Sequence, residues 1–150
     1  MEKKIYFAYG SNLNHRQMAY RCPDAEFVGT GFIKDYTMTF KGDNSGVADI
    51  IPCSGGRVPV GVWKISSADE RRLDIFEGFP RLYGKRAVRA LCGGKSVEGM
   101  VYTMSARKPV NLPSETYFNA ILDGYSDCGI DCEPLFNFMF QTKEMLDSLS

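Results

Sequence analysis

Residue types that can do chemistry are concentrated in two short segments of this 150-residue chain. The first is residues 6–13, where an apolar stretch ends in Gly10, Ser11 and Asn12. Such a stretch predicts a strand that turns into a helix, and the free backbone N–H groups at a helix entrance can bind a carboxylate or an oxyanion. Ser11 and Asn12 can add side-chain donors to such a site, or they can simply cap the helix. The segment alone leaves both interpretations open.

The second segment is residues 73–80, in which Glu77 lies between Phe76 and Phe79. A carboxylate at the end of the helix predicted here would face the partial negative charge of the helix C-terminus. That charge and the apolar neighbours would both raise the pKa of Glu77. A raised carboxyl pKa suits proton transfer near neutral pH. The alternative is an exposed glutamate in the last helical turn whose charge is solvated.

The composition excludes several other kinds of site. Eighteen basic and eighteen acidic residues give a formal net charge of zero, which argues against a nucleic-acid partner. A single histidine, His15, excludes sites built on several imidazoles and makes any Ser-His-Asp hydrolase depend on that residue. No apolar run approaches the roughly 20 residues of a membrane span, and no secretory signal is recognisable. We therefore expect a cytoplasmic protein with no membrane partner.

The five cysteines are odd in number and scattered in spacing, which is typical of reduced thiols in a chain that folds without disulfides. Two of them lie four residues apart, but no CxxC pair and no nearby histidine accompanies them, so no metal site is expected. No motif indicates a cofactor. The cysteines are Cys22, Cys53, Cys92, Cys128 and Cys132.

Apolar periodicity and turn residues predict strands in the first two thirds of the chain and helices in the last third. Pro52 and the pair Gly55-Gly56 separate two of the strands, and Gly93-Gly94 predicts a two-residue hairpin turn. The expected strands are 4–9, 26–40 (as one or two strands), 47–51, 57–65, 83–91 and 95–104. The segment 41–46 is expected to be a loop.

Helices are expected over 14–21, 68–77, 113–127 and 134–149. Ser67 and Glu70 have the spacing of a capping box, Gly78 marks the end of that helix, and Pro134 suits a first helical turn. In the third helix the inward-facing residues are Tyr117, Ile121, Leu122 and Tyr125. This order of elements predicts one α+β domain over residues 1–150, with a mixed, largely antiparallel sheet curled toward a barrel.

The two chemical segments together resemble the γ-glutamylcyclotransferase family and its AIG2-like relatives. The resemblance rests on YFAYGSNL near the N-terminus, on a GVWKI strand in mid-chain, and on LDIFEG followed by Tyr83. It runs from Ile5 to about Tyr102, with weaker agreement over 113–125. The γ-glutamylamine branch of the family usually carries a YGTL-type loop, so the Ser11-Asn12 pair favours the cyclotransferase and bacterial AIG2-like side.

The resemblance implies a small mixed β-barrel with flanking helices and a cavity between the YGSN loop and the glutamate. Glu77 would be the acid and base, and no cofactor would be needed. The residues that would hold substrate are Tyr9, Gly10, Ser11, Asn12 and Leu13 from the loop, together with Tyr83 and the later Tyr117. Residues 127–150 have no clear counterpart in the family, so their Phe-rich helix is expected either to cover the core or to form a homodimer contact.

The implied reaction closes a ring within the substrate. The α-amine of a γ-glutamyl compound attacks the γ-carbonyl, which gives 5-oxoproline and a free amine or amino acid, so the enzyme needs no nucleophile of its own. The implied partner is a small γ-glutamyl substrate. Alternatives are a γ-glutamylamine-specific cyclotransferase, a non-catalytic AIG2-like domain that only binds small molecules, and a cysteine-dependent acyl transferase.

Overall fold

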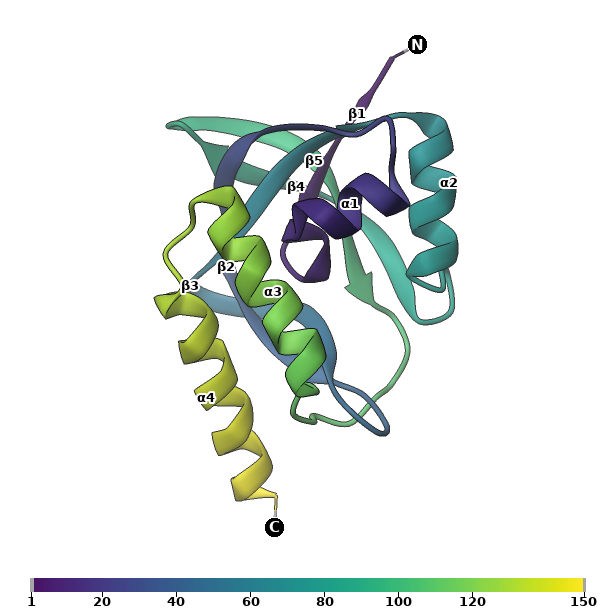
Figure 1. Ribbon diagram of the computed structural model, residues 1–150. Helices are drawn as coiled ribbons and strands as arrows, with labels where there is room; N and C mark the ends of the chain where they lie inside the picture. The colour runs from purple at the N-terminus through teal and green to yellow at the C-terminus, as the bar shows by residue number, and fades with distance from the viewer. Residues whose placement is uncertain (1, 150) are drawn as a thin grey trace.

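Five strands close into a small barrel in the computed structural model, which describes residues 2–149 (Figure 1). Their order around the barrel is β1-β3-β2-β4-β5, with β1 parallel to β5 and the other neighbouring pairs antiparallel. This confirms the predicted α+β fold with a small, largely antiparallel barrel and flanking helices. The elements are β1 (Lys4–Ala8), η1 (Ser11–Leu13), α1 (His15–Arg21), β2 (Glu26–Lys41), β3 (Val47–Ile65), α2 (Ser67–Phe76), β4 (Tyr83–Cys92), β5 (Lys95–Met104), α3 (Glu115–Cys128) and α4 (Glu133–Ser148).

The prediction of separate strands at 47–51 and 57–65 is wrong, because β3 runs through Pro52 without a break. Ala48 turns its backbone N–H and C=O away from β2, toward the hydroxyls of Tyr117 and Tyr83. Strand backbone groups alternate with a period of two, so the Pro52 nitrogen faces the same side. Within the described residues, the pairing of β1 with β3 is confined to residues 61–65 of β3, far from Pro52. At this edge the missing N–H therefore interrupts no ladder.

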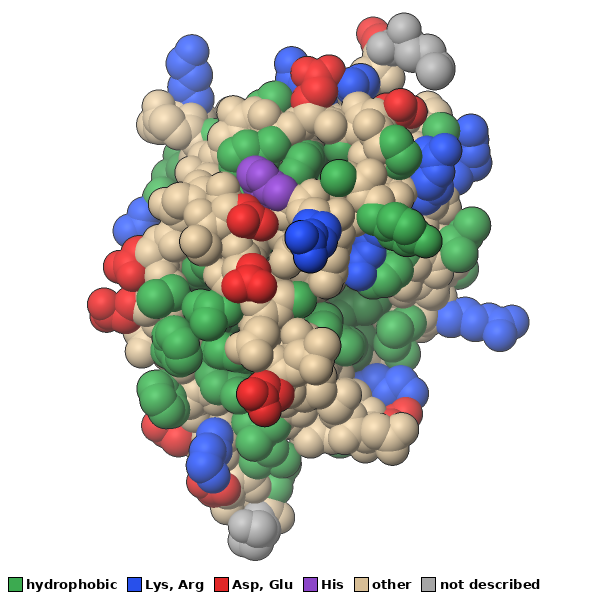
Figure 2. Space-filling view, in the orientation of Figure 1, with side chains coloured by type: hydrophobic (Ala, Val, Ile, Leu, Met, Phe, Trp, Pro, Cys, Tyr) green, Lys and Arg blue, Asp and Glu red, His purple; other side chains and the backbone are tan. Residues whose placement is uncertain are grey.

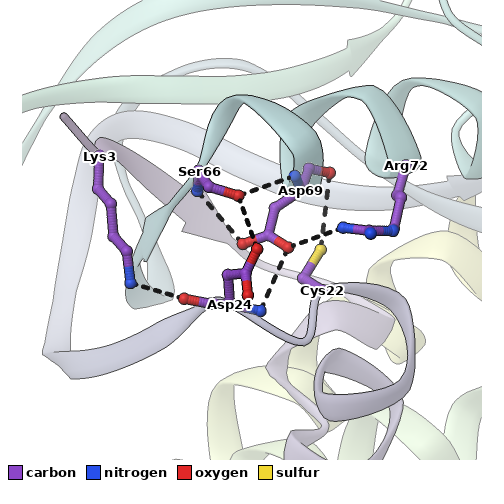
Figure 3. A network of polar contacts seen from close by, with 6 residues as sticks. All are labelled: Lys3, Cys22, Asp24, Ser66, Asp69 and Arg72. Carbon is purple, nitrogen blue, oxygen red and sulfur yellow. Dashed lines mark hydrogen bonds and ion pairs between the residues drawn. The ribbon is translucent and has the colours of Figure 1, made fainter. Parts of the chain in front are cut away.

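The capping box of α2 lies one residue earlier than predicted. Ser66, not Ser67, has the extended backbone of an N-cap, and its hydroxyl accepts from the N–H of Asp69. The Asp69 carboxylate accepts from the N–H of Ser66 in return. Figure 3 shows that the same carboxylate also reaches Asp24 and Arg72, so the start of α2 is joined to the turn after α1. Helix α2 ends at Phe76, one residue before the predicted end, with Glu77 as its C-cap. Gly78 marks the end of the helix as predicted, and its backbone is left-handed.

The segment after β1 differs from a plain strand-to-helix turn. Residues 11–13 form the short 3-10 helix η1, and α1 begins only at His15, with Asn14 as its N-cap. Helix α3 packs against η1 so closely that a Cβ at Gly124 would lie 2.7 Å from the Cβ of Leu13. The turn is therefore clamped between α1, α3 and the barrel.

Helices α3 and α4 lie side by side on one side of the barrel, with α4 extending toward the C-terminus (Figure 1). Of the predicted inward-facing residues of α3, Ile121 and Tyr125 are fully buried, while Tyr117 and Leu122 are half-buried. α4 packs against β2, and Figure 2 shows hydrophobic side chains gathered over it. The exposed ones are Phe136, Phe140 and Met145. Across residues 2–149, no helix is long and apolar enough to cross a membrane.

Candidate active site

A cavity of about 130 Å³ opens where η1, the end of α2 and the first residues of β3 meet. It brings together residues from positions 6 to 117, including both chemical segments of the sequence. Six of its thirteen lining residues are aromatic, and one is a carboxylic acid. The lining residues are Tyr6, Tyr9, Gly10, Ser11, Asn12, Val47, Ala48, Phe76, Glu77, Leu82, Tyr83, Tyr102 and Tyr117.

Glu77 is the carboxyl group of this cavity. It is the C-cap residue of α2, and its backbone N–H donates to the carbonyl of Leu73 at 2.8 Å, which fixes its backbone at the cavity wall. Its Oε1 accepts a 3.3 Å hydrogen bond from Nδ2 of Asn12. Burial raises the pKa of Glu77 to about 7, against the opposing effects of the Arg21 charge and the Asn12 hydrogen bond. A solvated glutamate, the alternative left open by the sequence, is therefore not what this fold produces.

The η1 turn forms the opposite wall. Asn12 is buried, and its Nδ2 donates to the hydroxyl of Tyr6 at 2.9 Å as well as to Glu77. Ser11 and Asn12 are the first two residues of the short helix η1. No carbonyl of that helix can accept from their backbone N–H groups. A Cβ at Gly10 would come within 3.2 Å of Ala48, so the backbone of this wall approaches β3 closely. The turn thus carries two backbone donors in residues that line the cavity.

Tyrosine hydroxyls fix the remaining walls. Tyr9 donates to the carbonyl of Tyr102 at 2.7 Å, and Tyr83 donates to the carbonyl of Ala48 at 2.5 Å. Tyr117 accepts from the N–H of Ala48 at 3.0 Å, which leaves its own hydroxyl hydrogen free to serve a ligand. Burial raises the pKa of Tyr117 to about 12. It also raises the pKa values of Tyr9, Tyr83 and Tyr102, so all four phenols are neutral near pH 7.

Seven of the eight site residues expected from the sequence line this cavity. The exception is Leu13, which is fully buried in the core and has its Cδ2 against Gly61. Sequence reasoning missed Tyr6 and Tyr102, which face each other edge to face at 5.8 Å between ring centroids. Tyr6 lies within the YFAYGSNL motif and could have been included on that ground, whereas Tyr102 has no local signal.

Other chemically interesting groups lie away from the cavity. Cys128 Sγ is 3.5 Å from Nε2 of His15, but burial raises the pKa of this thiol to about 12, so it is a poor nucleophile. None of the five cysteines lines the cavity. Among the residues that the structure describes, no three histidine, cysteine, aspartate or glutamate side chains converge as a metal site would require.

Comparison with known proteins supplies the family context of this cavity. The family model described as "Gamma-glutamyl cyclotransferase, AIG2-like" matches residues 6–119. The chain is 30% identical to the γ-glutamylcyclotransferases of Bos taurus and of Homo sapiens over 142 residues. Each alignment covers 88% of this chain and 75% of the relative.

Solved structures agree with the sequence comparison. A structure titled γ-glutamyl cyclotransferase is similar with a TM-score of 0.82 and 26% identity, over 95% of this chain and 87% of that one. An AIG2-like protein of Mus musculus shares the fold with a TM-score of 0.60 and 21% identity, over 77% of this chain and 90% of that one.

Proposed function

The chain belongs to the γ-glutamyl cyclotransferase, AIG2-like family, and we propose that it is an active γ-glutamylcyclotransferase. In the proposed reaction the substrate's α-amine attacks its own γ-glutamyl carbonyl, giving 5-oxoproline and a free amine or amino acid. One observation carries the proposal: burial raises the pKa of Glu77 to about 7 at the wall of a small cavity. A carboxyl group with a pKa near the working pH can both accept a proton and return it.

The size of the cavity supports a substrate of this class. A cavity of about 150 Å³ is known to hold one benzene molecule, and this one measures about 130 Å³. The space suits a γ-glutamyl group folded toward its five-membered ring. The leaving amine would then extend toward the mouth, past the half-exposed ring of Phe76. Folding the substrate into the reactive conformer contributes several kcal/mol of rate acceleration in reactions of this kind.

In the first proposed step, the Glu77 carboxylate removes a proton from the substrate α-ammonium group. The freed amine attacks the γ-carbonyl carbon, and a C–N bond forms as the carbonyl oxygen becomes an oxyanion. The N–H groups of Ser11 and Asn12 would donate to that oxyanion, and one such donor is worth about 3 kcal/mol in other enzymes. The hydroxyl of Tyr117 would donate to the substrate's α-carboxylate.

In the second proposed step, the carbonyl re-forms and the bond to the leaving nitrogen breaks. Glu77 gives its proton to that nitrogen, and its carboxylate then removes the second proton from the ring nitrogen, so the ring becomes a neutral lactam. That second proton passes to the released amine, which leaves as an ammonium ion, and the enzyme regains its starting protonation state. One carboxyl group is sufficient because the substrate supplies the nucleophile. A histidine base or cysteine nucleophile is not required.

The experiment that tests the proposal is a screen of γ-glutamyl amino acids, γ-glutamyl dipeptides and γ-glutamyl amines for release of 5-oxoproline. We expect turnover by the wild type and a loss of about 10³-fold in kcat for Glu77→Gln, within the range that a general acid-base group contributes. Glu144→Gln is the matched control, because Glu144 is exposed on α4, away from the cavity.

Each outcome of the screen separates the candidate functions. Turnover confined to γ-glutamyl amines would identify the amine-specific branch instead. Thermal stabilisation by γ-glutamyl ligands without any 5-oxoproline would identify a binding domain. Turnover by Glu77→Gln at the wild-type rate would remove Glu77 from the mechanism.

A further inference from the structure

Arg21, at the last position of α1, is a half-buried cation that forms no ion pair within the described residues. A guanidinium removed from water in this way normally lies against a carboxylate. Burial accordingly lowers the pKa of Arg21. No motif in the sequence singles this residue out, but its contacts indicate a specific task.

The guanidinium is held by three contacts, all of them with residues of the cavity wall. Its Nη1 donates to Oδ1 of Asn12 at 2.5 Å and to Oγ of Ser11 at 3.3 Å. Its carbon lies 3.5 Å from the ring centroid of Phe76, so the charged plane is stacked on the residue just before Glu77. Arg21 therefore joins the wall formed by η1 to the wall formed by the end of α2.

These contacts decide which way the Asn12 amide points. The oxygen of the amide faces the donors of Arg21, so its nitrogen must face the Tyr6 hydroxyl and the Glu77 carboxyl. The flipped amide would place an N–H₂ group against a guanidinium and a carbonyl oxygen against a carboxylate, and both contacts are repulsive.

We propose that Arg21 is a positioning residue of the active site, which orients the Asn12 amide toward Glu77 and places a positive charge beside that carboxyl group. This inference rests on the proposed function insofar as Glu77 is the acid and base. Arg21 need not touch the substrate, because it acts through Asn12 and through its charge.

The fold fixes Arg21 for this task. Figure 3 shows Cys22 and Asp24, which follow α1, hydrogen-bonded to Asp69 at the start of α2. Ser66 adds a further contact, from its hydroxyl to Asp24. Helix α2 then runs rigidly to Phe76 and Glu77, so the end of α1 and the end of α2 cannot move independently.

Other charged and titratable groups around Glu77 do not take the place of Arg21. Five phenols face the cavity, and burial raises the pKa of each, so they are neutral near pH 7. They are Tyr6 on β1, Tyr9 just after β1, Tyr83 on β4, Tyr102 on β5 and Tyr117 on α3. Asp74, on the same helix as Glu77, is engaged by Tyr102 and Lys85, and Asp49 is paired with Lys41. Arg21 is the cation whose charge lowers the pKa of Glu77.

The test is a titration of the Glu77 carboxyl carbon by ¹³C NMR, in protein labelled at glutamate, with Glu77→Gln to assign the signal. We expect Arg21→Gln to move the midpoint upward by about one pH unit, the low end of what an opposite charge at short range supplies. Arg21→Lys keeps the charge, so its midpoint should lie closer to the wild type. Arg16→Gln removes an exposed cation of the same helix and should change nothing.

An unchanged midpoint in a folded Arg21→Gln protein would overturn the proposal, as would a midpoint in Arg21→Lys that is as high as in Arg21→Gln. The titration needs no turnover, so it separates this inference from the proposed function. In an active enzyme, the loss of kcat/KM in Arg21→Gln should be about tenfold larger below pH ~6 than above pH ~9, because the base must be ionised to act. A loss of equal size at every pH would mean that Arg21 is only structural.

Discussion

Glu77→Gln should make the protein more stable at neutral and alkaline pH while it removes activity. Burial raises the pKa of Glu77 from 4.5 to about 7, so the folded state holds the proton more tightly than the unfolded chain does. At about 1.4 kcal/mol per pH unit, this difference corresponds to about 3 kcal/mol in the free energy of unfolding. Glutamine keeps the shape of the side chain and its acceptor for Asn12, and it carries no charge to desolvate.

The sign of the effect follows from the order of the two pKa values. Below pH ~4.5 the carboxyl group is protonated in both states, so wild type and variant should be equally affected by pH. Between pH ~4.5 and ~7 the unfolded chain binds fewer protons than the folded protein, so the wild type loses stability relative to the variant as the pH rises. Above pH ~7 the folded carboxyl is also ionised, and the difference should stay constant at about 3 kcal/mol.

Urea denaturation of both proteins across this pH range measures the difference directly. For a chain of this size, about 3 kcal/mol also corresponds to roughly 6–12 °C in Tm. Glu144→Gln, which removes an exposed carboxylate, should follow the wild-type curve. Two stability curves that stay parallel from acid to alkaline pH, or a gap that opens in favour of the wild type, would refute the reasoning.

Three further substitutions test the walls of the cavity and the support beneath it. Tyr83→Phe leaves the buried carbonyl of Ala48 without its donor, so we expect a loss of about 1–3 kcal/mol in urea denaturation. Gly10→Ala places a methyl group 3.2 Å from the Ala48 side chain, and kcat/KM should fall roughly 10- to 100-fold with far-UV circular dichroism unchanged. Asp69→Ala removes the capping box of α2 and the contacts of the Asp69 carboxylate drawn in Figure 3, so the free energy of unfolding should fall by about 2 kcal/mol or more. The control is Arg71→Ala, at an exposed position of the same helix, whose free energy of unfolding should stay within about 0.5 kcal/mol of the wild type.

The fold was predictable where local chemistry decides the structure. Gly93-Gly94 specified the β4–β5 hairpin because both residues adopt positive φ, and Pro134 correctly marked the first turn of α4. The prediction of a strand break at Pro52 was wrong because tertiary context decides whether a strand tolerates proline. At Pro52 one edge of β3 is unpaired, and an unpaired edge tolerates proline. The one-residue error in the capping box arose because Ser66 and Ser67 are chemically alike, and only the backbone conformation distinguishes them.

Sequence motifs indicated the residues of the candidate site that carry chemistry, but not the residues that hold them in place. Glu77 and the YGSN loop carry residue types whose chemistry is recognisable in isolation. Arg21 and Tyr102 act through partners 9 to 28 positions away in the chain, as in the bonds from Arg21 to Asn12 and from Tyr102 to Asp74. No spacing in a single sequence indicates such contacts, because they depend on how the barrel closes.

The choice of tyrosine for the cavity walls explains why Glu77 can have its raised pKa. Phenylalanine would make an apolar wall, but it could not hydrogen-bond to the backbone of β3 and β5 at the cavity edge. Here Tyr9 and Tyr83 donate their hydroxyl hydrogens to backbone carbonyls, and Tyr102 donates to Asp74. Among the described residues, Asn12 is then the one side chain that donates to Glu77, across 3.3 Å. A shorter bond or a second donor would stabilise the carboxylate and lower its pKa below the range useful for proton transfer. The hydroxyl hydrogens of Tyr9, Tyr83 and Tyr102 go to other acceptors and therefore leave the raised pKa of Glu77 in place.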